Sequence, residues 1–518
     1  MSPSVSDLLS GGISQLCRAQ CLAIACLFAG VVAAVLLRGC GAWQAVLAAW
    51  AVAEICFAAV VGCILLPEMR SLSKPAARKV RPWDLMQRIK RAIDSIDGLT
   101  LHEYLLGWFP SVSAEEKPKR GNVEEFAAWV MFSQDLSKLA DQESLEVTRC
   151  VDDFLHYYDY SLEDGYDPKF KSVRFTLEPD MKVMHRPLMV YVGTALIRWA
   201  GKLMMIMLGF RPLNCDGISY WYYSSNHVAA DQPPVLFFHG VGVGFLKYGL
   251  LIRTLMKNRS VIAVEQPWIS MALHTDVASE DHFISTIKKV LLRHSFDGTA
   301  SVVGHSYGSL TAAWMVQAMP RAVVDLILLD PVAILLAEPT VVRCFLYNDW
   351  STPMHFAIWA LASTELGMAW TLRRNFHWYN QALFREDIEQ VRRSLVVLSD
   401  SDVIVPSEKI ARHLSGASGN VQVMRLPKFH HGQFLLSPSI LSRIDIWLNG
   451  TRPASQATAR LPAGRRFGSG KRGKPRRTLS NLALCRMATV ASGALGAQHL
   501  MSRYPLREYE YEERQAAR

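Results

Sequence analysis

Ser306 lies in a Gly-X-Ser-X-Gly pattern, so its hydroxyl is a candidate nucleophile. The pattern runs from Gly304 to Gly308; an apolar stretch (299–303) precedes it, and residues 310–315 follow with helical spacing. This succession predicts a strand, a sharp turn and a helix, the nucleophile elbow that exposes a serine hydroxyl at the top of a sheet. The pattern alone also fits an ordinary turn, because glycine and serine are common turn residues. The partners of Ser306 farther along the chain favour catalysis.

An aspartate and a histidine follow Ser306 in the order that such a catalytic site requires. Asp402 comes soon after a second buried strand, residues 394–398, and His431 precedes a glycine and the apolar residues 434–436. A serine hydroxyl is a poor nucleophile until a histidine takes its proton, and a buried carboxylate holds that histidine in the required tautomer. The sequence therefore predicts Ser306 as the nucleophile, His431 as the base and Asp402 as the acid.

Alternatives stay open for both the acid and the base. Asp330 ends the apolar run 327–330 and could supply the acid from an earlier strand, whereas Asp402 stands at the expected strand edge. His430 is adjacent to His431, and only one of these two rings can face the serine. We expect Asp402 and His431 to act, with Asp330 and His430 as the alternatives.

A glycine-rich loop begins where another buried strand, residues 235–238, ends. It opens with His239 and Gly240, and glycines at this place let the backbone turn its N–H groups toward a developing negative charge. We expect the amides of Val241 and Tyr307 to form the oxyanion hole. A phosphate-binding loop is the alternative, but the glycine spacing is not of the nucleotide type and no Gly-Lys-Ser/Thr follows.

These landmarks give residues of about 213–448 a resemblance to the α/β-hydrolase superfamily, to serine esterases and lipases of the AB hydrolase-1 type. The resemblance implies an α/β fold with a mostly parallel sheet flanked by helices, a helical cap, and an acyl-enzyme mechanism that needs no metal and no organic cofactor. Within the superfamily the chain resembles uncharacterised membrane-anchored members from lower eukaryotes, which share a helical leader like residues 121–129.

Two long apolar runs precede this region. They cover residues 19–37 and 42–66, and the polar turn 38–41 separates them. Each run is long enough to cross a hydrocarbon core of about 30 Å, which predicts a transmembrane helical hairpin over residues 19–66. A signal peptide and a buried core hairpin are the alternatives. Glu54 is costly in lipid, so we expect it to face the partner helix or to reach an interface.

Basic residues predict the orientation of this hairpin. The turn carries only Arg38, whereas eight basic residues crowd the segment after the second run: Arg70, Lys74, Arg78, Lys79, Arg81, Arg88, Lys90 and Arg91. The positive-inside rule then puts the catalytic part on the cytoplasmic side. Removal of residues 1–66 is expected to release the protein from the membrane and to spare hydrolysis of a short soluble ester.

The remaining segments complete the predicted organisation. Residues 1–18 form an N-terminal tail, and residues 67–212 form a helical leader whose apolar stretch 188–210 is membrane-associated or packed on the core. A cap occupies about 332–393. Its aromatic side chains either build an apolar acyl pocket above the serine or hold the cap to the core: Phe345, Tyr347, Trp350, Phe356, Trp359, Trp370, Phe376, Trp378, Tyr379 and Phe384.

The formal net charge of +10 resides in the C-terminal tail, residues 449–518. From Gly450 onward there are 14 Arg and Lys against four Glu, among many Gly, Ser and Pro. This composition is typical of a disordered segment. Anionic lipid headgroups are the partner we expect. A nuclear-import or nucleic-acid role and a purely solubilising role are the alternatives.

The sequence thus predicts a membrane-bound serine hydrolase that cleaves carboxylic esters of apolar, lipid-type substrates. The same triad could pass the acyl group to an alcohol acceptor or could hydrolyse a thioester. A binding scaffold that kept the fold without catalysis is the alternative from another class; loss of a triad residue would favour it, and Ser306, Asp402 and His431 are all present.

Overall fold

The computed structural model describes residues 18–36, 41–71, 79–110, 112–175, 182–225, 232–274, 276–295, 297–348 and 352–450. Nearly all of the predicted N-terminal tail, the turn of the predicted hairpin and the basic tail from residue 451 lie outside these ranges.

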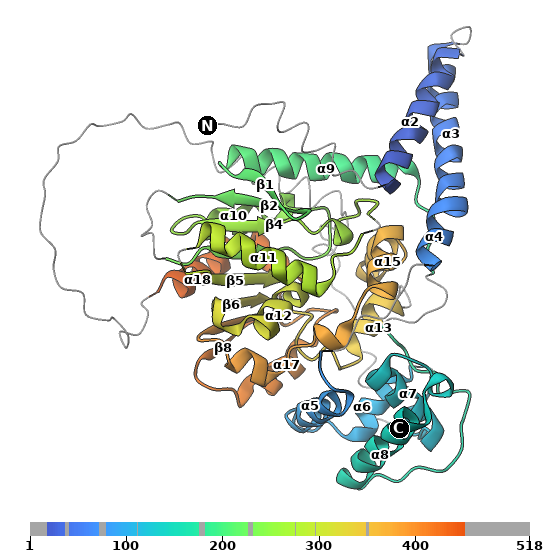
Figure 1. Cartoon of the computed structure of the whole chain (residues 1–518), viewed down its shortest axis with the longest axis vertical. Coiled ribbons are helices and arrows are strands. Elements are labelled where there is room, and N and C mark those ends of the chain that lie inside the picture. Colours follow the sequence, from blue (N-terminus) through green and yellow to red (C-terminus); the bar gives the residue numbers. More distant parts are fainter. Residues whose placement is uncertain are drawn as a thin grey trace, which may run out of the picture.

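One eight-stranded sheet forms the centre of the molecule (Figure 1). Its spatial order is β1-β2-β4-β3-β5-β6-β7-β8. The first two strands run antiparallel, β2 is antiparallel to β4, and all later pairs are parallel. The strands are β1 (Arg211–Cys215), β2 (Ile218–Tyr223), β3 (Val235–Phe238), β4 (Val261–Val264), β5 (Ala300–His305), β6 (Val323–Leu329), β7 (Ser394–Ser399) and β8 (Val421–Leu426).

The sheet starts earlier than the sequence indicated. The predicted domain begins at about residue 213, yet Arg211–Cys215 already forms β1 and pairs with β2. This edge strand contains Pro212 and is largely exposed, so it lacks the apolar pattern that marks a buried strand.

Helices cover both faces of the sheet. On one face lie α10 (Gly249–Leu255) and α18 (Pro438–Asn449), and on the other lie α11 (Glu280–His294), α12 (Gly308–Ala318) and α17 (Ser407–Ser415). The parallel strands between them are apolar on both sides, because helices cover both of their faces. In β3, for example, Val235 and Phe237 point into one core while Leu236 and Phe238 point into the other.

The cap and the leader pack together. Between β6 and β7 the cap contains α13 (Thr340–Leu346), α14 (Pro353–Ile358), the π-helical turn η6 (Trp359–Ser363), α15 (Leu366–Arg374) and α16 (Arg385–Glu389). The leader contains α5 (Pro82–Asp94), α6 (Leu101–Trp108), α7 (Arg120–Phe132) and α8 (Asp141–Tyr157). The Trp129 ring of the leader stacks on the Trp378 ring of the cap, with centroids 5.6 Å apart. The leader is therefore part of the same core as the cap.

Short 3-10 turns connect several of these elements: η2 (Leu136–Lys138), η3 (Leu246–Tyr248), η4 (Pro267–Ile269), η5 (Pro320–Ala322), η7 (Trp378–Asn380) and η8 (Gln433–Leu436).

The two apolar runs near the N-terminus form helices that lie side by side and project from the rest of the molecule (Figure 1). They are α2 (Arg18–Leu36) and α3 (Ala42–Val60), and the second continues through η1 (Val61–Leu65) and α4 (Leu66–Ser71). A methyl group added at Gly30 would lie 2.6 Å from the Ala49 carbonyl oxygen, so the two helices are in close contact.

A third long apolar helix, α9 (Leu188–Met207), corresponds to the predicted stretch 188–210 and runs along the sheet (Figure 1). Two helices of the described chain are long and apolar enough to cross a membrane: Trp43–Arg70, which includes nearly all of α3, and α9. In α9, Met204 and Met205 are buried in the core beside β3 and β4, so this helix packs on the sheet domain along one face.

Candidate active site

Ser306 stands on a tight turn between β5 and α12. Its backbone has a φ of +53°, a conformation that L residues rarely adopt. A methyl group at Gly304 would lie 2.6 Å from the Gly308 carbonyl oxygen, and one at Gly308 would lie 2.2 Å from the Phe238 carbonyl oxygen. The two glycines are thus required by contact with backbone, and the turn has the geometry of a nucleophile elbow.

The three predicted residues Ser306, His431 and Asp402 are in contact. Ser306 Oγ lies 2.8 Å from His431 Nε2, and His431 Nδ1 lies 2.6 Å from Asp402 Oδ2. The other oxygen of Asp402 accepts hydrogen bonds from the amides of Ile404 and Val405. Burial of the His431 ring opposes a positive charge, but the charge and hydrogen bond of Asp402 outweigh it and raise the pKa of His431 above its ordinary 6.5.

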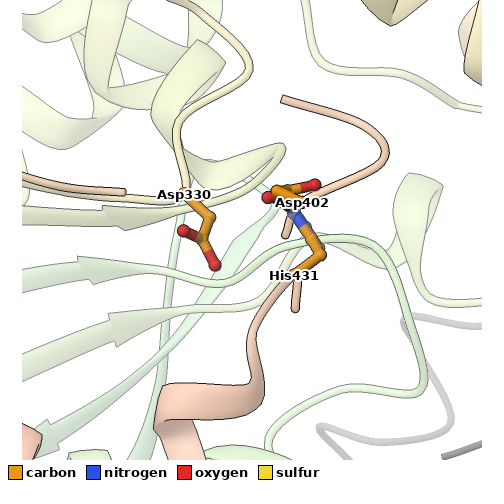
Figure 2. A group of neighbouring side chains, drawn as sticks. All are labelled: Asp330, Asp402 and His431. Carbon is orange, nitrogen blue, oxygen red and sulfur yellow. Dashed lines mark hydrogen bonds and ion pairs between the residues drawn. The ribbon is translucent and has the colours of Figure 1, made fainter. Parts of the chain in front are cut away.

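The alternative acid, Asp330, lies next to this group but has other partners (Figure 2). Its carboxylate accepts hydrogen bonds from Ser399 N at 2.8 Å, Ser399 Oγ at 3.0 Å and Gly432 N at 2.7 Å. Burial and the nearby charge of Asp402 raise the pKa of Asp330. Asp330 therefore holds the backbone beside His431 in place, whereas Asp402 contacts the ring itself.

The alternative base, His430, is turned to another part of the loop. Its Nδ1 lies 2.9 Å from the Ser401 carbonyl oxygen, and its amide donates to Gln433.

The grouping at this site could also hold a metal ion. Its possible ligand atoms lie within 4.8 Å of one another and belong to Asp330, Asp402 and His431. Both His431 nitrogens, however, already have Asp402 and Ser306 as partners.

The two residues predicted to supply the oxyanion amides lie beside Ser306. Val241, Ser306 and Tyr307 line one pocket. Within the described residues, the amides of Val241 and Tyr307 donate to no other protein group. Two unengaged N–H groups beside a serine hydroxyl can stabilise a tetrahedral oxyanion.

His239 and Gly240 shape the loop that carries Val241. The Gln266 amide donates to His239 Nε2 at 3.2 Å, so the proton resides on Nδ1, which donates to the Gly240 carbonyl at 2.9 Å. Burial lowers the pKa of His239 to about 4, so the ring is neutral. His239 therefore supports the loop as a neutral ring.

Several residues of this network escaped the sequence analysis. Tyr248 Oη accepts from the Gly240 amide at 2.8 Å, and Lys247 Nζ donates to the Val241 carbonyl at 2.8 Å. Burial lowers the pKa of Lys247 to about 8. Gln266 Nε2 also donates to the His239 carbonyl. These residues lie in a short helical turn and just after a strand, where polar side chains are common. No sequence motif therefore identifies them as part of a site.

The pocket at Ser306 is apolar, and its free space is only about 20 Å³. Side chains must therefore move before an acyl chain can enter. Its walls come from the leader, the sheet domain and the cap: Phe175, Val241, Ser306, Tyr307, Leu310, Val332, Leu336, Val341, Phe345, Leu346, Leu372 and Phe376. A larger cavity of about 480 Å³ shares the walls Phe345 and Leu346 and also contains Lys182 and Arg373.

Of the nine predicted cap aromatics that the structure describes, Phe345 and Phe376 are the only ones that line the pocket at Ser306. Trp378, Tyr379 and Phe384 are buried in the core that the cap shares with the leader. Trp370 packs near α3, Trp359 lines the larger cavity, and Trp350 lies outside the described residues. Holding the cap in place is therefore the main task of these rings.

No family model matches this chain, and no curated protein matches it. Solved structures resemble about half of this chain at low sequence identity. A serine hydrolase of carbazole degradation is 21% identical, covering 46% of this chain and 97% of that chain, with a TM-score of 0.34.

Two other solved structures are similar to the same degree. A membrane phospholipase A, described as a bacterial virulence factor, is 14% identical over 50% of this chain and 93% of that chain, with a TM-score of 0.35. A monoacylglycerol lipase from Paleococcus ferrophilus is 17% identical over 45% of this chain and 98% of that chain, with a TM-score of 0.32. The mostly parallel eight-stranded sheet, the elbow after β5 and the helical cap before β7 give this chain the α/β-hydrolase fold.

Proposed function

We propose that this protein is a serine hydrolase that cleaves carboxylic esters of apolar, lipid-type substrates through an acyl-enzyme. The contact of Ser306 Oγ with His431 Nε2, and of His431 Nδ1 with Asp402, carries this proposal. A hydroxyl, a base and an orienting carboxylate in this order are the parts that nucleophilic acyl transfer needs.

In the proposed reaction the Ser306 oxygen attacks the ester carbonyl while His431 takes the hydroxyl proton. The amides of Val241 and Tyr307 donate to the negative oxygen of the tetrahedral intermediate. His431 then gives its proton to the leaving alcohol, and the acyl group stays on Ser306. Water, activated by His431, attacks the acyl-enzyme and releases the acid. An alcohol acceptor in place of water makes the same site an acyltransferase, and a thioester substrate makes it a thioesterase.

The pocket supports the substrate class. Apart from the Ser306 hydroxyl and the backbone, its walls are aliphatic and aromatic, and burial of each CH₂ group of a chain contributes about 0.8 kcal/mol. An apolar acyl group gains most from such a pocket, and a charged one would lose its hydration without a partner.

We further propose that the protein is bound to a membrane by α2 and α3, with the catalytic domain on the cytoplasmic side. The exposed apolar side chains of both helices and the basic residues that follow support this placement. Anionic lipid headgroups are the proposed partner of the basic tail, and nucleic acid is not.

A fluorophosphonate probe tests the hydrolase proposal, because it labels activated serines. The full-length protein should be labelled, and Ser306→Ala should not be. Equal labelling of both proteins, or no labelling of a folded full-length protein, would favour the non-catalytic scaffold instead.

A further inference from the structure

We infer that α2 and α3 enter only one leaflet of the membrane and that α9 lies flat in the surface of that leaflet. This placement differs from two full spans, and it does not depend on whether Ser306 is catalytic. Three observations carry it: the two faces of α9, its attachment to α3, and the distribution of exposed apolar side chains along α2 and α3.

The α9 helix has one protein face and one apolar outer face. Gly201, Met204 and Met205 are buried against the sheet domain. The Arg198 guanidinium donates to the Met271 carbonyl at 2.6 Å, which also fixes this face. The outer face exposes large apolar side chains at helical spacing: Met189 60%, Leu196 63%, Trp199 64%, Leu203 41%, Ile206 49% and Met207 51%. A helix with this division is suited to lie in a membrane surface.

The start of α9 is joined to the middle of α3. Glu54 accepts hydrogen bonds from the amides of Leu188 at 2.7 Å and Met189 at 3.2 Å. Glu54, which we predicted to face α2 or to reach an interface, satisfies two amides at the start of α9 that have no partner within their own helix. This contact fixes the height along α3 at which α9 begins, and therefore the height of the proposed membrane surface.

The part of the helix pair beyond that level is short. Ala42, the first residue of α3, lies twelve residues before Glu54. At 1.5 Å per residue this is about 18 Å, roughly half of a hydrocarbon core of about 30 Å. On α2, Gly30 already touches Ala49 and Ala53 of α3, so only the end of α2 lies farther out.

Exposed apolar side chains concentrate in this outer part. On α2 and the first half of α3 they are Phe28 67%, Val31 58%, Val32 42%, Val35 48%, Trp43 82%, Val46 55%, Leu47 69% and Trp50 37%. Ile24 and Ile55 are exposed near the level of Glu54. On the inner side of that level, toward α4, Ile64 is the only large apolar side chain exposed in the described part of this helix, at 36%.

One face of the inner half of the long helix is apolar because it packs on protein. Phe57, Val61, Leu65 and Met69 are buried in what we call the junction cluster, which also contains Ala23, Cys26, Ala53, Leu188, Tyr191, Leu273, Leu366 and Trp370. Hydropathy alone cannot separate this protein contact from lipid contact. A single membrane leaflet would cover both the outer half of α2 and α3 and the outer face of α9.

A full crossing would require the polar sheet domain to sink into hydrocarbon, together with the ion pair of Lys202 and Glu265 beside α9. One charge opposes our placement. It is Arg38, which follows α2 in the sequence, and snorkelling of a long arginine side chain lowers the cost of a position in lipid.

Depth-dependent quenching tests this inference in phosphatidylcholine–phosphatidylserine vesicles that contain the full-length protein. p-Azidophenylalanine replaces Trp43, Trp199 or Leu292 in turn and is coupled to a fluorophore; Leu292 is the control, since it is 65% exposed on α11. Quenchers are attached to the lipid near the headgroup or near the chain end. We expect the chain-end quencher to act most on position 43, the headgroup quencher to act most on position 199, and neither to act on position 292.

Two other results would overturn the inference. If position 43 is quenched most by a headgroup quencher confined to the far leaflet, the hairpin crosses the bilayer. If position 199 is as unquenched as position 292, α9 does not contact lipid.

Emulsion droplets give an independent comparison, because a triolein droplet coated with a phospholipid monolayer has no far leaflet. The full-length protein should transfer from vesicles to such droplets, and its exclusion from them would indicate two full spans.

Discussion

Two aspartates lie close to His431, and their contacts assign them different tasks. Asp402 bonds to the ring, while Asp330 bonds to the backbone of Gly432 and to Ser399. Both negative charges raise the pKa of His431. Asp402 can therefore orient the base during proton transfer, whereas Asp330 positions the loop on which the base stands.

Substitution of the two acids separates these tasks. Asp402→Asn should lower kcat by about 10⁴-fold, because the wrong histidine tautomer is then favoured. Asp330→Asn should instead lower the free energy of unfolding by about 1–3 kcal/mol, since the Gly432 amide loses its buried acceptor. His430→Ala should change kcat little. Short-ester kinetics and thermal unfolding measure both quantities, and a larger loss of kcat in Asp330→Asn would exchange the two roles.

The pH dependence of turnover follows from the raised pKa of His431. The ring must be neutral to take the Ser306 proton, so kcat/KM should fall as the pH drops through that pKa, above the ordinary 6.5. Asp330→Asn removes one charge that raises this pKa, so the acid limb should move to lower pH. Asp400→Asn is the matched control, because Asp400 pairs with Arg425 instead. A limb that does not move in Asp330→Asn would contradict this electrostatic account.

Among the elements, the long N-terminal helix has two functions along its length. Its outer half exposes apolar side chains, and its inner half packs on the cap through Leu366 and Trp370 of α15. Because α15 also supplies Leu372 to the pocket at Ser306, the inner half of this helix supports the pocket from behind. This contact amends the expectation that residues 1–66 can be removed without effect on hydrolysis of a short ester.

Two truncations test the division. Deletion of residues 1–66 removes Phe57, Val61 and Leu65 from the junction cluster. Burial of each of these side chains contributes about 1.5–3 kcal/mol, so the free energy of unfolding should fall by on the order of 5 kcal/mol. Short-ester hydrolysis should fall as well. Deletion of residues 1–41 keeps the whole of α3 and should leave this hydrolysis largely unchanged. Thermal unfolding and short-ester kinetics in detergent compare the two, and equal activity would show that the junction cluster is dispensable.

For the whole molecule, the proposed orientation places the catalytic domain in the cytoplasm whether α2 and α3 cross the membrane or enter one leaflet. Both arrangements return the chain to its starting side after the second helix. Attachment of N-linked sugar distinguishes the two sides of the membrane, because it happens only in the lumen.

The two glycosylation sequons should therefore stay unmodified in cells. They are Asn258-Arg259-Ser260 and Asn449-Gly450-Thr451. Asn258 is exposed and is the more sensitive reporter, since the Asn449 side chain bonds to Arg259 and Asp445. Mobility in gels should not change after glycosidase treatment. A shift that Asn258→Gln abolishes would put the catalytic domain in the lumen.

The residues that meet at the candidate site could be predicted from local sequence because parallel strands bring their carboxyl ends to one edge of a sheet. The elbow at Ser306, the loop at His239, and Asp402 and His431 after later strands were each recognisable from their own neighbours in the chain. The helices α2, α3 and α9 were likewise visible from composition alone.

Tertiary contacts decided the rest. Which histidine of the pair meets Ser306, and which aspartate holds its ring, depends on the path of two loops across the sheet. Phe175 and Phe376 are in contact and both line the pocket at Ser306, although about two hundred residues separate them. The apolar run 42–66 also predicted one kind of surrounding, yet lipid is proposed around its first half, while protein covers one face of its second half. A hydropathy pattern records that a side chain avoids water, and only packing determines what it meets instead.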